Sequence, residues 1–234
     1  LGTQMKATGE VMAIGETIEE CLLKSVRSLE TGVCHLWLAK FDSYTKDQLV
    51  DYIKESRDDN IFAISQLFRM GMSVAEIHDI TNITEFFLES IKGIIDFENV
   101  IKSNVNDLEI LKTAKTKGFC DAFIAKLWNV SEIEVFNLRK ENKIMPVYKM
   151  VDTCHTGAYM PYFYSAYNTD NQSIISDRKK IIVLGAGPIR IGQGVEFDYS
   201  TVHAVSTIRK SGYEAIIINN NPETVSTDYT TSDK

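Results

Sequence analysis

The residues best placed to do chemistry in this sequence gather in a glycine-rich loop near its carboxyl end. The loop contains Gly185, Gly187, Gly192 and Gly194, with Arg190 among them. Glycines let a backbone come close to a ligand, and amides ahead of a helix can bind an anion. Arg190 would add a planar fork of donors for a phosphate or a carboxylate. The loop is therefore a candidate anion-binding site.

An alternative is that the loop is only a tight turn between a strand and a helix. Arg190 would then pair with Glu196 or Asp198, and the spacing alone does not decide between these readings. A dinucleotide site fits less well, because its fingerprint needs a third glycine at position 190 and a carboxylate after the second strand. Asn219 follows that strand, so the sequence argues against a nicotinamide enzyme.

The other reactive side chains are the four cysteines, Cys21, Cys34, Cys120 and Cys154. They are widely spaced, and no two of them form a C-x-x-C motif. No histidine near them completes a metal-ligand pattern. We interpret them as reduced thiols and predict no metal site.

The glycine loop must be positioned by a strand before it and a helix after it. Residues 180–184 form a short continuous apolar run, which is typical of a strand buried on both faces. A helix is predicted over about 200–211, ending at Gly212, and a second buried strand over 214–219. These elements make one βαβ unit with parallel strands. Because two strands and one helix cannot cover both faces of a sheet, we expect the domain to continue beyond Lys234.

Residues 32–150 have the pattern of six to eight short helices. Capping boxes predict helix starts at Thr45 with Gln48, at Ser73 with Glu76 and at Ser131 with Glu134. Further N-cap candidates are Asp107 and Asp121, and helix ends are expected at Gly71 and Gly118. This part of the chain is therefore predicted to be an all-α domain.

Two of the predicted helices carry a clear apolar stripe. The longest is predicted over 84–103, and its apolar face comprises Phe87, Ile91, Ile94, Ile95 and Ile101. An earlier helix is predicted to start at a capping box of Thr17 and Glu20 and to stop at Gly32. Its stripe comprises Ile18, Cys21, Leu22, Val26 and Leu29.

Residues 144–177 change character. Residues 145–148 and the aromatic run from Tyr159 to Tyr167 look extended, and the polar stretch 168–177 is interpreted as a linker. The tyrosines could form a ligand platform. We favour a strap packed across two domains, with the hydroxyls reaching solvent.

The composition is that of a globular protein, with 44% hydrophobic and 24% charged residues. A net charge of -7 argues against binding to a nucleic-acid backbone. No apolar run reaches the ~18 residues of a membrane span. Residues 1–10 also lack the pattern of a signal peptide. We therefore expect no membrane partner and no nucleic-acid partner.

One alternative of a different class is a DNA-binding regulator. Residues 122–135 resemble a helix-turn-helix in pattern, with the turn near Asn129. The second helix would begin with Glu132 and Glu134, where base contacts are expected. Residues 31–150 also contain 15 basic and 18 acidic side chains. Both observations argue against this alternative.

The glycine loop is part of a longer motif. Residues 187–199, GPIRIGQGVEFDY, and residues 221–229, NPETVSTDY, resemble two motifs that open the second synthetase half of the carbamoyl phosphate synthetase large subunit. Residues 4–15 resemble the end of the first half, just after its ATP-grasp fold. Residues 117–121 and 146–154 resemble the helical oligomerization domain between the halves. The resemblance spans the whole chain.

This resemblance implies a mainly α fold in which residues 32–171 are the helical oligomerization domain. Residues 1–31 would be the tail of the first ATP-grasp synthetase half. Residues 172–234 would start the second half as an incomplete α/β, Rossmann-like βαβ unit, termed pre-ATP-grasp in the family. The chain is thus expected to be an internal fragment of a larger enzyme.

Enzymes of this family make carbamoyl phosphate from bicarbonate, glutamine-derived ammonia and ATP, for pyrimidine and arginine biosynthesis. The resemblance implies a cytoplasmic ligase with a glutaminase small subunit as its partner. The family's ATP and Mg²⁺ (or Mn²⁺) ligands lie in the ATP-grasp domains. We therefore expect no cofactor and no catalytic residue in this chain, and no activity of the chain alone.

The resemblance implies two roles for this chain, in bordering a passage for carbamate and in self-association. Gly194 matches a glycine that borders the passage for carbamate, and Met5 matches a segment near that passage in the first half. A side chain at Gly194 would narrow the passage, although a glycine there could also serve only the turn. The helical domain mediates self-association in the family, so we expect it to do so here.

Overall fold

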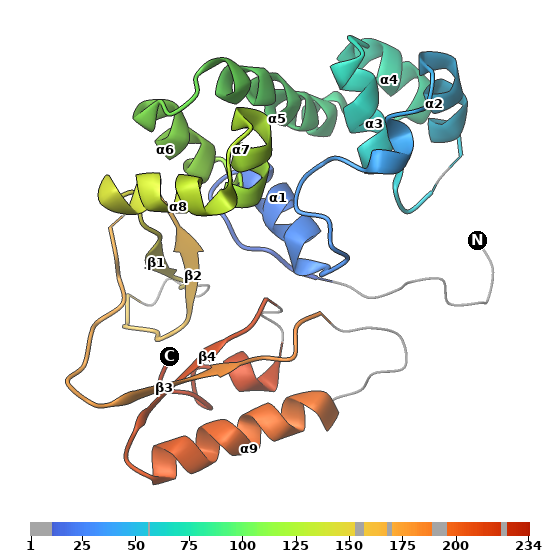
Figure 1. The fold of residues 1–234 in the computed structure, drawn as a ribbon. Helices are drawn as coiled ribbons and strands as arrows, with labels where there is room; N and C mark the ends of the chain where they lie inside the picture. The colour runs from blue at the N-terminus through green and yellow to red at the C-terminus, as the bar shows by residue number, and fades with distance from the viewer. Residues whose placement is uncertain (1–10, 56, 153–156, 168–169, 189–195, 221–223) are drawn as a thin grey trace, which may run out of the picture. The chain divides into compact units, whose positions relative to one another are not determined.

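The computed structural model describes residues 11–55, 57–152, 157–167, 170–188, 196–220 and 224–234 (Figure 1). These residues form two compact units. Residues 16–27 and 31–145 are termed the helical unit, and the described residues of 11–15, 28–30 and 146–234 are termed the α/β unit. Helix predominates among the described residues, which confirms the mainly α fold.

The helical unit is built from short helices. They are α1 (Ile18–Ser28), the 3-10 helix η1 (Ala39–Phe41), α2 (Lys46–Ile53), α3 (Asn60–Arg69), α4 (Val74–Thr81), α5 (Glu85–Ser103), α6 (Leu108–Thr116), α7 (Asp121–Trp128) and α8 (Glu132–Glu141). Seven α-helices, α2 to α8, lie in the described part of 32–150, within the predicted range. The longest is α5, which begins one residue after its predicted start.

Side-chain caps fix where most of these helices begin. All three predicted capping boxes of 32–150 form, at Thr45, Ser73 and Ser131. In the first, the Gln48 amide donates to Thr45 Oγ1 at 3.3 Å and the Thr45 amide donates to Gln48 Oε1 at 2.8 Å. Asp107 caps α6 as predicted. Each cap supplies acceptors for amides that have no partner within the helix.

The start of α7 differs from its prediction. Its N-cap is Cys120, and Asp121 is instead the first helical residue. Asp121 is buried between two cations, with Lys115 Nζ at 2.7 Å and Arg139 Nε at 2.6 Å from its carboxylate. The long-range ion pairs therefore outweigh the local capping preference of this side chain.

Helix α1 is shorter than predicted. It ends at Ser28, and Glu30 takes the left-handed conformation at φ 52°, so Gly32 lies beyond the helix end. Only half of its capping box forms. The Glu20 amide donates to Thr17 Oγ1 at 3.2 Å, but the Glu20 carboxylate accepts from the Glu16 amide.

The apolar faces of two helices are rotated from their predicted positions. In α1, Leu23 is fully buried and Leu29 is 37% exposed. In α5, Leu88 is fully buried and Phe87 is 52% exposed. Helical spacing predicts a stripe but leaves its exact phase to the packing of neighbouring helices.

One continuous apolar core runs through the helical unit. Its largest fully buried side chains are Phe41, Phe119, Leu23, Leu36, Leu49, Ile64, Leu67, Ile77, Leu88, Ile94, Ile101 and Leu111. Helix α5 is central, because α3, α4, α6 and α7 all pack against it. This unit buries its apolar surface within itself.

The α/β unit begins with a two-stranded antiparallel sheet. Strand β1 (Val147–Met150) pairs with β2 (Phe163–Ala166), which confirms the predicted extended structure. In the described part of the predicted linker, Asn171 and Gln172 lie beside β1. The Tyr148 amide donates to Asn171 Oδ1 at 3.0 Å, and the Gln172 amide donates to the Tyr148 carbonyl at 2.9 Å. These bonds hold that part of the segment against the sheet.

The second sheet of the α/β unit is the predicted βαβ unit. Strands β3 (Lys180–Leu184) and β4 (Glu214–Ile218) are parallel and hydrogen-bonded to each other. Helix α9 (Glu196–Lys210) connects them and begins one turn before its predicted start, and η2 (Val225–Thr227) follows β4. Asp198 suits the first turn of this helix, where the dipole is positive.

One helix leaves one face of these strands uncovered in the described chain, as expected for a βαβ unit alone, so their burial on both faces stays a prediction. Leu184 is 76% exposed, Ile182 is 57% exposed and Ile218 is 49% exposed. Helix α9 packs on β3 and β4 (Figure 1), and no second described helix covers the sheet. A buried strand needs a layer on each side, and only one is present among the described residues.

Candidate functional site

The glycine loop begins where β3 ends. The Gly185 amide donates to the Ile218 carbonyl at 2.7 Å, and the Gly187 amide donates to Asn219 Oδ1 at 3.1 Å. Gly187 has a φ of +84°, which side chains disfavour. A Cβ added at Gly185 would lie 2.5 Å from Asn219 Cγ. Glycine is therefore required at 185 because the Asn219 side chain crosses the loop there.

These hydrogen bonds occupy two of the backbone amides for which anion contacts were predicted. In this conformation the amides of Gly185 and Gly187 already have acceptors within the chain. Arg190, Gly192 and Gly194 lie outside the described residues, as does Met5. The anion contacts and the wall of the passage therefore stay predictions.

A cluster of small polar side chains extends from Asn219 at the carboxyl ends of the parallel strands. Asn219 Nδ2 donates to Thr224 Oγ1 at 3.2 Å, and Thr224 Oγ1 lies 3.2 Å from Ser226 Oγ. The Ser226 amide donates to Asp198 Oδ2 at 2.9 Å. Asp198 is buried, and its Oδ1 has no partner among the described residues. Asn219 thus links the glycine loop to the segment after β4. In the sequence, Asn219 stands where a dinucleotide site needs a carboxylate, and that pattern did not indicate this linking role.

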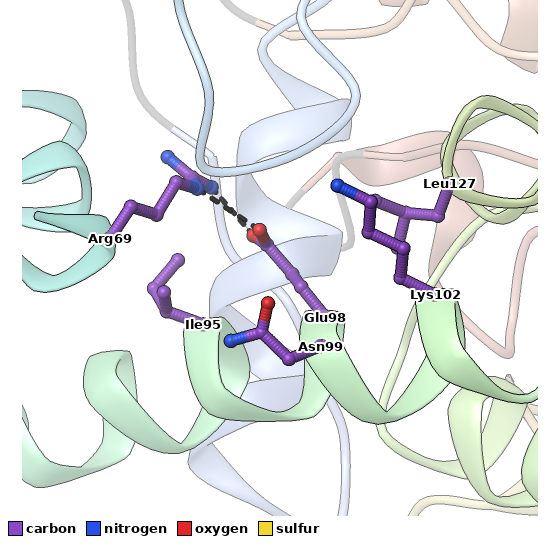
Figure 2. A pocket seen from close by; sticks show the side chains of 6 residues that line it. All are labelled: Arg69, Ile95, Glu98, Asn99, Lys102 and Leu127. Atoms are coloured by element: carbon purple, nitrogen blue, oxygen red, sulfur yellow. Dashed lines mark hydrogen bonds and ion pairs between the residues drawn. The ribbon is translucent and has the colours of Figure 1, made fainter.

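The helical unit holds a different arrangement, a pocket with a charged pair in its lining (Figure 2). Arg69, at the end of α3, reaches Glu98 on α5 through two hydrogen bonds of 3.0 and 2.5 Å. Arg69 also donates to the Leu36 carbonyl at 2.8 Å. The pocket has a volume of about 190 Å³ and is lined by Arg69, Ile95, Glu98, Asn99, Lys102 and Leu127.

A buried histidine lies on the other side of Glu98. His35 Nε2 lies 2.9 Å from Glu98 Oε1, and the His35 ring stacks on Phe123 at 3.6 Å between centroids. Burial lowers the pKa of His35, so its imidazole is neutral. Burial works to raise the pKa of Glu98, but hydrogen bonds from His35 and Arg69 hold that pKa below its usual range. Glu98 is therefore an ionised carboxylate with both oxygens engaged.

This geometry favours a structural role over a catalytic one. A general base must reach substrate, and both Glu98 oxygens are already bonded to Arg69. The network links α3, α5 and the segment before η1 into one body. No local sequence pattern indicates this network, because Glu98 is separated from Arg69 by 29 residues and from His35 by 63.

The described parts of the chain contain no group of three or more His, Cys, Asp or Glu residues that could hold a metal ion. None of the helices there combines the length and apolar character that crossing a membrane requires. Cys21, Cys34 and Cys120 are not joined in disulfides, and Cys154 lies outside the described residues.

Comparison with protein families assigns both parts of the chain. Residues 10–143, more than half of the chain, match the oligomerisation domain of the carbamoyl-phosphate synthetase large chain. Residues 177–234 match the carbamoyl phosphate synthase preATP-grasp domain. Helices α7 and α8, the alternative helix-turn-helix, lie inside the first match, and no observation supports a DNA-binding role for them. The chain therefore belongs to the carbamoyl-phosphate synthetase large-chain family.

Proposed function

We propose that this chain works within the large chain of a cytoplasmic, glutamine-dependent carbamoyl phosphate synthetase. Residues 1–31 are the tail of the first synthetase half, residues 32–171 the oligomerization domain and residues 172–234 the start of the second half. The chain joins the halves, supports self-association and lines the carbamate passage. It supplies no catalytic residue, because ATP and Mg²⁺ or Mn²⁺ bind in the ATP-grasp domains and the small subunit supplies ammonia.

The observation that carries this proposal is the order of the two matched domains, with the oligomerisation domain at 10–143 and the preATP-grasp domain at 177–234. The structure adds support from each unit. The helical unit buries its own apolar core, so its surface is available for an interface with another copy. The βαβ sheet leaves Ile182 and Leu184 exposed, as expected of a layer that packs against further protein.

Self-association can be tested by sedimentation velocity of the 234-residue chain over a wide concentration range. We expect the mean sedimentation coefficient to rise with concentration, and a strict monomer would contradict the proposal. The strongest candidate contacts are Phe86 and Phe87 in the first turn of α5, which are 57% and 52% exposed. Replacing both by serine should weaken association. Ile133→Ser on α8, where the side chain is 60% exposed, is the matched control.

The passage can be tested by Gly194→Phe in the complete enzyme. A bulky ring should block transit of carbamate while leaving the first ATP-consuming step intact. Bicarbonate-dependent ATP turnover should persist and carbamoyl phosphate output should fall, with Gly194→Ala showing the smaller effect of one methyl group. Equal loss of both activities would contradict a role confined to the passage.

Nucleotide binding is expected to require the ATP-grasp domains. Calorimetry of the 234-residue chain with MgATP should show no binding in the micromolar range. The engaged amides of Gly185 and Gly187 support this expectation. Micromolar affinity would instead show that the glycine loop binds the nucleotide by itself.

A further inference from the structure

Two cysteines far apart in the sequence meet in the helical unit. Cys34 lies in the segment between α1 and η1, and Cys120 is the N-cap of α7, 86 residues further on. Cys120 Sγ lies 3.7 Å from the Cys34 carbonyl oxygen, so the two residues are in direct contact. Both side chains are half-buried, so a small oxidant can reach them.

The position of Cys120 is not explained by helix capping. Serine, threonine, aspartate and asparagine are the side chains that cap helices well. Cys120 makes no capping hydrogen bond to α7, and its thiol donates to the Cys34 carbonyl instead. The contact between the two cysteines therefore decides how this side chain is oriented.

Two cations bind the backbone carbonyls of the two residues before Cys120. Arg27 Nη1 donates to the Gly118 carbonyl at 2.7 Å, and Lys115 Nζ donates to the Phe119 carbonyl at 2.8 Å. A thiolate at the start of a helix and beside positive charge is stabilised. The neighbouring Cys34, together with the charges of Arg27 and Lys115, lowers the pKa of Cys120.

The two thiols are therefore not equivalent. The neighbouring Cys120, together with burial, raises the pKa of Cys34. A low-pKa thiol beside a second cysteine is the arrangement found in thiols that sense oxidants. Cys120 is suited to attack an oxidant, and Cys34 is placed to resolve the product.

We propose that Cys34 and Cys120 form a redox-responsive pair that hydrogen peroxide converts to a disulfide and that a low-molecular-weight thiol reduces again. The Cys120 thiolate attacks one peroxide oxygen, the O–O bond breaks, and Cys120 becomes a sulfenic acid while the departing hydroxide takes a proton to form water. The Cys34 sulfur then attacks Cys120 Sγ, the S–O bond breaks, and the hydroxide leaves as water with the Cys34 proton. Two thiols and one peroxide thus give one disulfide and two waters.

This reaction would link the segment after α1 to the start of α7. Asp121, the next residue, holds Lys115 and Arg139 in the buried ion pairs described above. A disulfide that closes a long loop restricts the unfolded chain and so favours the folded unit. The oxidised chain should therefore unfold at a temperature about 5 °C higher than the reduced chain.

The test treats the reduced 234-residue chain with a small molar excess of hydrogen peroxide and maps its peptides without reduction. We expect one dominant linked peptide, joining Cys34 to Cys120, which a thiol reductant removes. Cys34→Ser should leave a sulfenic acid on Cys120 that dimedone traps. Cys120→Ser keeps a good N-cap and should leave Cys34 unmodified. The Cys21→Ser variant changes a described cysteine outside the pair, and it should still form the disulfide between Cys34 and Cys120.

Alkylation rates provide a second readout that does not require the disulfide. At about pH 6, iodoacetamide should modify Cys120 about tenfold faster than Cys21, because more of Cys120 is thiolate. Equal rates together with no linked peptide would overturn the proposal. A disulfide to Cys154 or between two chains, in place of the link between Cys34 and Cys120, would overturn it as well.

Discussion

The helical unit and the α/β unit bury apolar surface to very different extents. In the helical unit, side chains such as Leu88, Ile94 and Phe119 are at most 1% exposed. In the βαβ part of the α/β unit, Leu184 is 76% exposed and Ile182 is 57% exposed. Since burial of apolar surface is the main favourable contribution to folding, the helical unit carries its stability within itself. The βαβ sheet gains less of this stabilisation, because many of its apolar side chains stay exposed.

Charged groups show the same contrast. The helical unit encloses two networks of buried charges, one around Asp121 and one around Glu98, whose hydrogen bonds join separate helices. The main polar cluster of the βαβ part instead joins the glycine loop to the segment after β4, around Asn219. The first arrangement fixes a domain, and the second shapes a loop at the edge of a sheet. Substitutions in the two units should therefore have unequal effects.

The largest expected effect comes from truncating the helical core. Phe119 is 1% exposed, and its ring lies 4.9 Å from that of His35. Phe119→Ala should lower the free energy of unfolding by about 4 kcal/mol, through lost burial and the cavity that remains. Leu184→Ala should change it by less than about 0.5 kcal/mol. Urea unfolding of both variants measures this difference, and equal losses would contradict the contrast between the units.

A slightly smaller loss is expected from breaking the buried ion pairs. Asp121→Asn leaves Lys115 and Arg139 buried without their counter-charge and should cost about 3 kcal/mol. Asp96→Asn, which breaks an exposed pair with Lys92, should cost less than about 1 kcal/mol. Urea unfolding at neutral pH compares them. Equal costs would show that the buried network adds no more than a surface pair.

The same variant has a defined pH dependence. Burial works to raise the pKa of Asp121, but the charge of Lys115 and hydrogen bonds from Lys115 and Arg139 hold that pKa below its usual range. The stabilisation from this carboxylate is therefore complete above its unfolded pKa of about 3.9 and is lost as pH falls through the lower folded pKa. The difference between wild type and Asp121→Asn should be constant above about pH 5 and shrink below about pH 4. A difference that grows on acidification would contradict this assignment.

Glycine substitutions should have opposite effects in the two units. Gly185→Ala forces a methyl group against Asn219 and should destabilise the end of β3 by about 2 kcal/mol. Gly93 lies inside α5, and an added Cβ there would find its nearest neighbour at 3.9 Å. Gly93→Ala should therefore stabilise the helical unit by about 0.8 kcal/mol. Hydrogen exchange of β3 and α5 reports each effect, and two changes of the same sign would refute this prediction.

The smallest effect is expected at a helix cap. Ser131 accepts the Glu134 amide in a complete capping box, so Ser131→Ala should cost about 1 kcal/mol. Ser90→Ala changes the same side chain within α5, where it only donates to the Phe86 carbonyl, and should be nearly neutral. Thermal unfolding distinguishes the two. Indistinguishable midpoints would show that the box contributes nothing.

Features that depend on nearby residues could be predicted from the sequence. The capping boxes at Thr45, Ser73 and Ser131 were predictable because each involves residues only three apart. The position of β3 (Lys180–Leu184) was also predictable, since residues 181–184 are a continuous apolar run followed by glycine. The family motifs indicated both matched domains for the same reason, as runs of adjacent residues.

Features that depend on distant partners could not be predicted. Asp121 looks like an N-cap in the sequence, and only the folded chain places Arg139 beside it. The contact between Cys34 and Cys120 spans 86 residues and has no local pattern. Burial of β3 was predicted from its apolar run, but burial also depends on what covers the sheet, which the run does not specify.

Hydrogen exchange of the 234-residue chain tests the contrast between the two units most directly. Amides of α3, α5 and α7 should exchange most slowly, close to the rate set by global unfolding, because they surround the closed core. Amides of β3 and β4 should exchange much faster, through local opening of the thinly covered sheet. Equal protection of α5 and the two strands would contradict the account.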